Sequence, residues 1–436
     1  MTFLPIRLFS KEEQKRRFIG HKQRAVAISI VFLALLNDRL SRSLVIPILP
    51  FLVGQANATG VTIGLLVTGY SITSMIVNPF AGELCDRFGR RPVLIVSLAL
   101  AFSGMTLFGV AGALPLMFVG RLIDGIGGAS ASISATIIAD VTPPRRRTEA
   151  FGLLSTAAAI AIILGPGLGG ALASQAPRLP IYIASLALFC NALFALLFLP
   201  ETFSTRLVPK LRESSAESLD SDSVGSSANP SFWQSFLSSL AIFKNRRVFL
   251  SSVGFTLISI AGYGLLAVIS LYMSKTLSWG AHEAGLAFSI AGLATVVQQF
   301  TIVGPLSRRF SSSQMLIIAH IQALIGLTIL LFPVFPSRAV EVVFSITMIT
   351  LALGLIAPVI RSLVAESSGA QMSGSTMGVI QSMQNLGSCF GPTIVGIVYS
   401  STSPEGSFEF STLFTVMGLV FIVLAGRGLS RRPKVA

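Results

Sequence analysis

The sequence predicts an all-α membrane protein with twelve transmembrane helices, arranged as two six-helix pseudo-repeats. Three observations lead to this fold class. Hydrophobic residues make up 52% of the 436 residues and charged residues only 11%, whereas a soluble domain carries about 25% charged residues. The mean hydropathy of the chain is +0.78. Long apolar runs follow one another along the chain, and its two halves share motifs at similar offsets.

The apolar runs give the expected helices. About 20 apolar residues are needed to cross the hydrocarbon core of a bilayer. In chain order the expected spans cover residues 26–53, 61–81, 92–112, 114–138, 151–174, 179–199, 248–273, 281–304, 313–333, 339–361, 372–400 and 410–426. An even number of spans places both termini on the same side of the membrane.

The basic residues predict the orientation. With the N-terminus inside, 25 Lys and Arg residues fall on the inner side, and only Arg178, Lys275 and Arg338 fall on the outer side. Cytoplasmic loops carry such an excess of cations. We therefore expect an integral, multi-pass protein of the plasma (cell inner) membrane, with both termini cytoplasmic. The net charge is +14, but the basic residues lie between the apolar runs and do not gather on one stripe. This distribution argues against nucleic acid as a partner.

Several other classes of site are not expected. Cys85, Cys190 and Cys389 are too far apart in sequence for a zinc motif or a disulfide framework. A phosphate-binding Gly-Lys loop is absent, and the three histidines are scattered. The basic first 24 residues lack a cleavage site, so no cleavable signal peptide is expected. We expect no metal, no cofactor and no enzymatic activity.

Repeated motifs divide the chain into two halves. Gly165-Pro166 recurs as Gly391-Pro392 at an offset of 226, and Gly82 has a counterpart in Gly304 at an offset of 222. The polar, Ser-rich stretch between the halves is expected to be a linker. The predicted segments are a cytoplasmic arm (1–25), a six-helix half (26–200), a cytoplasmic linker (201–247), a second six-helix half (248–426) and a cytoplasmic tail (427–436).

A basic turn between the second and third spans carries the most specific motif. Residues 82–92 read Gly-Glu-Leu-Cys-Asp-Arg-Phe-Gly-Arg-Arg-Pro. This stretch resembles the signature loop G-x-L-x-D-R-x-G-R-R of the major facilitator superfamily. The agreement covers Gly82, Leu84, Asp86, Arg87, Gly89, Arg90 and Arg91. The resemblance implies a secondary carrier that works by alternating access, with this turn as a cytoplasmic gate and Asp140 as a partner for its arginines.

The first span contains a cluster of polar residues. Asn37, Asp38, Arg39 and Arg42 lie in its middle, followed by an apolar segment that ends in Pro-x-x-Pro. The pattern resembles helix 1 of drug and amine exporters in the superfamily. Asp38 and Arg42 are four residues apart and can pair along one helix face. We expect the cluster to line a substrate cavity with Asp38 as a proton-coupling site. The alternative is that these three charges neutralise one another and serve only helix packing. Because Arg39 is an additional cation, an anionic substrate is a further alternative.

The fourth span contains the second buried charge pair. Arg121 and Asp124 are three residues apart within a segment that resembles the superfamily motif R-x-x-x-G-x-G. Among eighteen acidic residues, Asp38 and Asp124 alone lie well inside the expected spans. Ionisable residues within a membrane are functional candidates because their burial is costly. The resemblance implies that Arg121 tunes a proton-binding carboxylate, and a purely structural pair is the alternative.

Proline and glycine interrupt the fifth span. Gly165, Pro166, Gly169 and Gly170 are expected to kink this helix and allow a neighbour to approach closely. The segment is similar to the G-P-x-x-G-G motif of exporters in the superfamily. Gly391 and Pro392 repeat the interruption in the eleventh span. Simple helix packing is the alternative explanation.

The second half offers only neutral polar groups at comparable depth. These are Gln298, Gln381, Gln384 and Asn385, which are expected either to contact substrate or to join helices.

Together the resemblances imply proton-coupled export of amphipathic drug-like or amine-like small molecules. The alternative is a transporter of a specific metabolite, sugar or lipid, including an anionic one. The expected partners are a small-molecule substrate, protons and the lipid bilayer, and the expected functional unit is a monomer.

Overall fold

The computed structural model describes residues 21–54, 59–142, 147–199, 243, 245–368 and 374–426, and its regular secondary structure there is helical. The first half contains α2 (His21–Val53), α3 (Gly60–Phe88), α4 (Arg90–Val110), α5 (Leu114–Gly127), α6 (Ser130–Val141), α7 (Arg147–Ala173) and α8 (Leu179–Phe198). The second half contains α11 (Arg246–Thr276), α12 (Ala281–Thr301), α13 (Val303–Arg309), α14 (Ser312–Leu331), α15 (Arg338–Ser368), α16 (Gly374–Ser401) and α17 (Pro404–Gly426).

Ten spans in the described part of the chain are long and apolar enough to cross a membrane, with α5 and α6 together making one of them. Helices α2 and α16 are also long, at 33 and 28 residues, but they are not among these ten spans. They bring the arrangement to the twelve helices that the sequence predicts. The polar residues in α2 include the cluster of Asn37, Asp38, Arg39 and Arg42 noted in the sequence.

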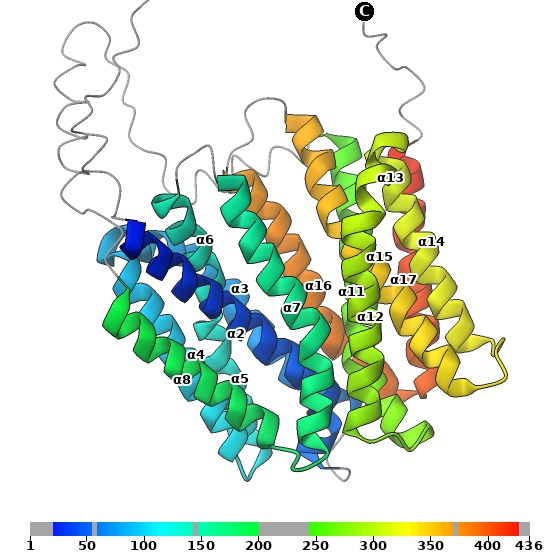
Figure 1. The fold of residues 1–436 in the computed structure, drawn as a ribbon. Helices are drawn as coiled ribbons and strands as arrows, with labels where there is room; N and C mark the ends of the chain where they lie inside the picture. Colours follow the sequence, from blue (N-terminus) through cyan, green and yellow to red (C-terminus); the bar gives the residue numbers. More distant parts are fainter. Residues whose placement is uncertain are drawn as a thin grey trace, which may run out of the picture.

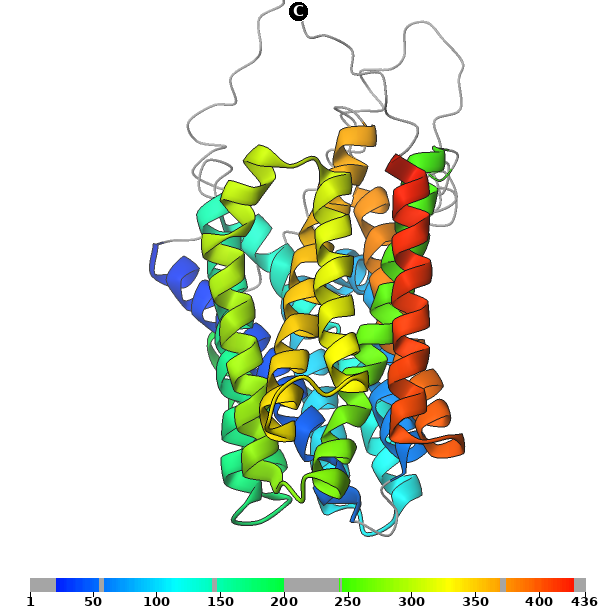
Figure 2. The same ribbon diagram turned by 90° about the vertical axis from the view of Figure 1, so that its right-hand side faces the viewer.

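The two halves stand side by side as two helical groups (Figure 1). Helices α2 to α8 form one group and α11 to α17 the other, with α7 and α16 between them. Helix α7 packs against α12, and α16 packs against α3, so each half contacts the other through a helix that contains an internal proline. The view turned by 90° shows second-half helices upright and side by side at the front of the bundle (Figure 2).

Each half has its own apolar core, and its outer surface is also apolar. Large side chains such as Leu186, Leu197 and Phe300 are 60%, 63% and 70% exposed. Exposed apolar patches of this extent mark an interaction surface. On helices of this length, that surface is the one that faces lipid.

The predicted basic turn at residues 82–92 is mostly helical, which corrects the sequence-based prediction. Helix α3 continues to Phe88 and α4 begins at Arg90, so the turn is the single residue Gly89. Gly89 has φ of 94°, a conformation that glycine adopts without steric cost. Its N–H caps the helix by donating to Cys85 O at 3.0 Å. The motif residues before Gly89 therefore lie on a helix.

Two other expected elements differ from the structure. The fourth span is broken between Gly127 and Ser130, and a Cβ added to Gly127 would lie 2.4 Å from Ala101 N. Helix α4 therefore packs directly on the backbone at the break. The last helix begins at Pro404 and not at residue 410. Proline is favoured in the first helical turn, because the missing N–H has no intrahelical partner there.

Close contacts between the halves reproduce the repeat. A Cβ added to Gly64 of α3 would lie 2.2 Å from Pro392 O, and one added to Gly285 of α12 would lie 2.4 Å from Pro166 O. The prolines are 226 residues apart, as predicted, and the glycines 221, one fewer than the offset taken from Gly82 and Gly304. The two interfaces are thus pseudo-symmetric copies of each other.

Candidate functional site

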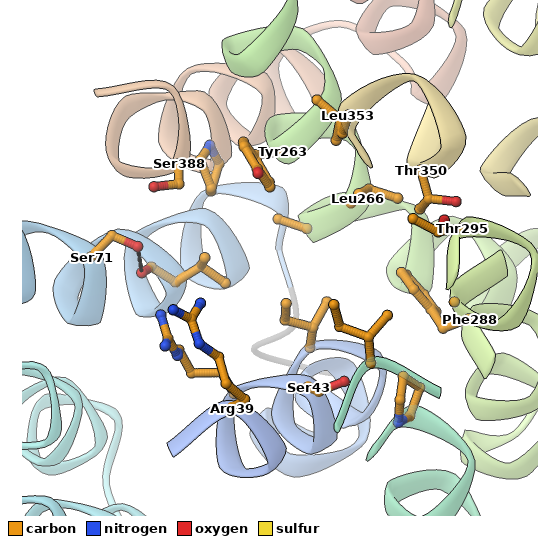
Figure 3. A pocket seen from close by; sticks show the side chains of 18 of the residues that line it. Arg39, Ser43, Ser71, Tyr263, Leu266, Phe288, Thr295, Thr350, Leu353 and Ser388 are labelled. Carbon is orange, nitrogen blue, oxygen red and sulfur yellow. Dashed lines mark hydrogen bonds between the residues drawn. The ribbon is translucent and has the colours of Figure 1, made fainter. Parts of the chain in front are cut away.

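A cavity of about 490 Å³ lies between the two halves. Four helices of each half contribute to its wall: α2, α3, α5 and α7 from the first, and α11, α12, α15 and α16 from the second. In the close-up, Arg39, Ser43 and Ser71 face a wall formed by second-half residues (Figure 3). The lining is Arg39, Arg42, Ser43, Ile46, Val67, Tyr70, Ser71, Arg121, Ile162, Pro166, Tyr263, Leu266, Ala267, Phe288, Gly292, Thr295, Thr350, Leu353, Gly354, Ala357, Ser388 and Pro392.

Asp38 is at the centre of the first charge cluster. Its carboxylate is buried, with 7% of the side chain exposed, and pairs with Arg42 one turn further along α2. Arg39 Nε lies 3.9 Å from the same carboxylate oxygen, Oδ2, and 44% of the Arg39 side chain is exposed. Both arginines line the cavity. The structure therefore pairs Asp38 with Arg42, as their spacing predicts, and it also places Arg39 near the same carboxylate, which the spacing did not predict.

Arg121 and Asp124 form the second charge cluster. Arg121 Nη1 donates to Asp124 Oδ2 at 2.9 Å, and Arg121 Nε donates to Leu66 O of α3 at 3.3 Å. Both side chains are buried, at 4% and 6% exposure. Arg121 reaches the cavity wall, whereas Asp124 lies behind it. A buried ion pair is costly to desolvate, and removing one partner strands the other charge.

Tyr70 of α3 lies between the two charge clusters. Its hydroxyl donates to Asp38 Oδ1 at 3.3 Å. The guanidinium carbons of Arg121 and Arg42 lie 4.9 Å and 5.2 Å from its ring centroid. Cations within about 6 Å of an aromatic ring are attracted to its face. The sequence analysis did not identify Tyr70, although a tyrosine in the middle of an apolar span is a signal, since the chain has only five tyrosines.

Cations outnumber anions around the cavity. Arg39, Arg42 and Arg121 line it, and the carboxylates beside them are those of Asp38 and Asp124. Arg42 and Arg121 each pair closely with one carboxylate. The guanidinium of Arg39 shares Asp38 at a longer distance, so this wall carries an excess positive charge.

The second-half wall carries no formal charge among the lining residues. Tyr263, Leu266 and Phe288 supply aromatic and apolar surface, and Thr295 and Thr350 supply hydroxyl groups. A largely apolar lining with a few polar groups is typical of sites for small amphipathic molecules. The apolar wall and the charged wall thus face each other across the cavity (Figure 3).

Two predicted cavity residues bond elsewhere. Asn37 Nδ2 donates to Ala187 O of α8 at 3.2 Å, which ties two helices of the first half together. Gln298 is buried and donates to Leu351 O at 2.9 Å, while it accepts from Gln322 at 3.0 Å. Their amides satisfy buried backbone groups, which is the helix-joining alternative. Neither residue lines the cavity.

The remaining predicted cavity residues lie on α16. Asn385 is half-buried and does not line the cavity. The side chains of Gln381 and Gln384 lie outside the described part of the structure, so their predicted role stays a prediction.

The predicted gate lies at the junction of α3 and α4. Arg91 Nη2 donates to Leu196 O of α8 at 2.6 Å, so it braces two helices of the same half. Arg90 is buried, and Arg87 is exposed beside the ring of Phe88. The backbones of Gly82, Asp86 and Asp140 are helical, but their side chains lie outside the described part. The predicted pairing with Asp140 therefore stays a prediction.

The proline-glycine motif of α7 forms a contact surface for two helices. A Cβ on Gly165 would lie 2.6 Å from Ser43 Cβ, and one on Gly169 would lie 2.7 Å from Leu44 O, both on α2. A Cβ on Gly170 would lie 2.3 Å from Ala281 O of α12. Helix packing therefore accounts for these glycines. Pro166 and Pro392 line the cavity themselves, and Gly391 packs on Ile260 O of α11.

The described residues include no cluster of three or more His, Cys, Asp or Glu side chains that would hold a metal ion.

Comparisons with known proteins agree with this architecture. Multidrug resistance protein 2 of Bacillus subtilis is 25% identical over 425 residues, covering 97% of this chain and 96% of the relative. The class D tetracycline resistance protein of Salmonella ordonez is 27% identical, covering 88% and 91%. The crystal structure of the nucleoside transporter NupG superposes with a TM-score of 0.72 at 14% identity, covering 94% of this chain and all of that one.

The family model described as Major Facilitator Superfamily matches residues 31–392 and 253–435. The twelve-helix architecture, the central cavity and this match lead to one conclusion: the chain belongs to the Major Facilitator Superfamily.

Proposed function

We propose that this protein exports amphipathic, drug-like small molecules in exchange for protons. The relatives that match most of the chain carry the names of multidrug and tetracycline resistance proteins. The cavity between the halves has the size and the mixed lining that such molecules need. We propose a transport role for this chain and not an enzymatic one.

The observation that carries proton coupling is a pair of buried carboxylates near Tyr70: Asp38 accepts from the Tyr70 hydroxyl, and Asp124 pairs with Arg121 beside the Tyr70 ring. Asp38 and Asp124 are each ion-paired with an arginine at the cavity wall. Protonation of either carboxylate would release its arginine, because a neutral carboxyl group no longer attracts the guanidinium. Proton binding thus changes the charge presented to the cavity. We assign Asp38 as the coupling site, with Asp124 and Arg121 as its buried counterpart.

The charge balance of the cavity refines the substrate class. The guanidinium of Arg39 repels a cationic group that approaches the first-half wall, and both nearby carboxylates already have arginine partners. Substrates whose amphipathic body carries no permanent positive charge are therefore favoured over amine-like cations.

The direction of transport requires an orientation in the membrane. The 25-to-3 distribution of basic residues supports cytoplasmic termini in the plasma (cell inner) membrane. The Gly89 turn would then face the cytoplasm, where Asp86, Asp140 and the arginines form the gate. Exposed ion pairs contribute only about 0–1 kcal/mol each, which suits contacts that break in every cycle. The functional unit is proposed to be a monomer.

The test is reconstitution into liposomes with an imposed pH gradient. The movement of a neutral amphipathic dye is followed for the parent, Asp38→Asn and Asp124→Asn. We expect gradient-driven movement in the parent. Asp38→Asn should abolish the response to the gradient and retain dye-for-dye exchange, because the substrate cavity remains while the titrating group is gone.

The matched control is Glu409→Gln, which removes an exposed carboxylate on α17, outside the cavity. It should transport like the parent. Gradient-driven transport that survives in both aspartate variants would contradict proton coupling at these residues. A parent that moves dye down its own gradient and ignores pH would identify a uniporter.

A further inference from the structure

A hydroxyl from one half enters the helix hydrogen-bonding pattern of the other half at α7. Gly167 N–H, directly after Pro166, donates to Ser289 Oγ of α12 at 2.8 Å. Ser289 Oγ in turn donates to Ile163 O at 2.8 Å. In a regular helix, Gly167 N–H would donate to Ile163 O itself. The serine hydroxyl is therefore inserted between a donor and an acceptor that normally bond each other.

A related arrangement occurs at α16 with the two halves exchanged, where the side-chain hydroxyl of Thr393 is the donor in place of a backbone N–H. Thr68 Oγ1 of α3 donates to Cys389 O at 2.5 Å, and it accepts from Thr393 Oγ1 at 2.8 Å. Thr393 directly follows Pro392, and Cys389 is four residues before it. The acceptor carbonyl is thus again the one that the residue after the proline would use in a regular helix.

The two sites occupy equivalent positions in the chain, and their acceptor carbonyls correspond. Ser289 and Thr68 each lie eight residues after the first residue of their helix, Ala281 and Gly60. Ile163 and Cys389 are 226 residues apart, which is the offset of the two motif prolines. The repeat has therefore placed one hydroxyl of each half against the proline-containing helix of the other.

We propose that Ser289 and Thr68 are paired positioning residues that hold the two halves together on the side of the membrane opposite the termini. Both hydroxyls lie within the first nine residues of helices that begin on that side. Transport requires the halves to part there, so both hydroxyls must release in each cycle. We name the two contacts the hydroxyl latches.

Release of the Ser289 latch leaves no buried backbone group of α7 without a partner. When Ser289 withdraws, Gly167 N–H can donate to Ile163 O, as in a regular helix. One hydrogen bond within α7 then replaces the two that pass through the serine hydroxyl, so the closed arrangement has a net advantage of about one hydrogen bond. A contact this weak suits a transition that must reverse many times.

The inference rests on the proposed transport role, but not on the substrate or on protons. Its test therefore measures the distance between the halves directly. Spin labels are attached to cysteines at Ala113 and Ser337, exposed residues in loops of the two halves on the latch side. Cys85, Cys190 and Cys389 are first replaced by alanine. Distances are measured in liposomes for the parent and for Ser289→Ala, Thr68→Val and the double variant.

We expect the single variants each to raise the ratio of separated to closed populations about fivefold, the effect of losing one hydrogen bond. The double variant should raise it further. Ser289→Thr and Thr68→Ser, which keep the hydroxyl, should match the parent. The control Thr347→Val removes a hydroxyl that bonds only Val343 O of its own helix and should leave the distances unchanged.

Parental distance distributions in both Ser289→Ala and Thr68→Val would overturn the proposal. A shift in only one of them would overturn the pairing of the latches, and equal shifts in the hydroxyl-retaining variants would show a packing effect instead. If the parent does not respond to a pH gradient in the dye-transport experiment, but the latch variants show the expected distance shifts, proton coupling is rejected and the latches are retained.

Discussion

Tyr70 Oη of α3 donates a hydrogen bond to Asp38 Oδ1 of α2 at 3.3 Å, while the ring of Tyr70 lies beside Arg42 and Arg121. One side chain therefore contacts the proposed coupling carboxylate and the arginines of both charge clusters. The hydroxyl of Tyr70 bonds the anionic Asp38, and its ring lies beside the cationic Arg121, which pairs with Asp124. A change in the charge of either aspartate can therefore affect the position of Tyr70.

Substitution of Tyr70 tests this connection. Tyr70→Phe removes only the hydroxyl, and we expect it to lower the maximal rate of gradient-driven dye transport several-fold while the apparent affinity stays within about twofold. Tyr70→Leu also removes the ring from the cavity wall, so it should weaken affinity as well. Initial rates measured over a range of dye concentrations separate the two effects. Parental rates in Tyr70→Phe would show that the hydrogen bond has no part in coupling.

The buried Arg121–Asp124 ion pair predicts that the loss of stability caused by replacing Arg121 is largely recovered when Asp124 is also replaced. Arg121→Leu strands a buried carboxylate and should lower stability by about 3–5 kcal/mol. Arg121→Leu combined with Asp124→Asn removes the stranded charge and should recover most of that loss. Thermal unfolding of the purified protein in detergent measures both, with Lys275→Leu at an exposed site as the control. Equal losses in the single and double variants would contradict a dominant charge effect.

The uneven pairing of Arg39 predicts charge selectivity. Arg39→Gln removes the guanidinium that shares Asp38 at 3.9 Å. We expect a cationic amphipathic dye to bind several-fold more tightly to this variant, and a neutral analogue with the same apolar body to bind within about twofold of the parent. Equilibrium binding in detergent measures both dyes. Lys275→Gln, which removes an exposed cation outside the cavity, should change neither affinity, and unchanged cation binding in Arg39→Gln would refute the electrostatic argument.

The glycines of α3 predict a contrast between two positions on one helix. A Cβ at position 64 would overlap Pro392 O at 2.2 Å, whereas a Cβ at Gly69 would find its nearest neighbour at 3.8 Å. Gly64→Ala should therefore destabilise by about 1–3 kcal/mol, since overpacking forces backbone shifts. Gly69→Ala should be neutral or stabilising, because alanine favours helix by up to about 1 kcal/mol over glycine.

Thermal unfolding checks both variants. Gly285→Ala provides an independent copy of the first experiment, because its Cβ would lie 2.4 Å from Pro166 O in the pseudo-symmetric interface. Similar stability for Gly64→Ala and Gly69→Ala would mean that the halves do not pack as closely as the structure describes.

Local sequence patterns predicted the parts of the site that depend on one helix. The spacing of Asp38 and Arg42, and of Arg121 and Asp124, places each pair on one helix face, and the structure contains both pairs. The offset of 226 likewise identified the equivalent prolines, because a repeat preserves sequence spacing. Asn37 and Gln298 show the limit of this approach. Their depth in a span indicated burial, but the direction of each side chain depends on neighbouring helices.

The sequence by itself determined the membrane character, the helical fold class, the two-fold repeat and the charged residues of the first half. These follow from apolar length, spacing and charge, which are properties of one chain segment at a time. The tertiary structure alone decided that Tyr70 joins both charge clusters, that the turn shrinks to Gly89, and that Ser289 and Thr68 bond the opposite half. Such contacts join residues up to 325 positions apart, and a single sequence holds no local signal for which distant helices will meet.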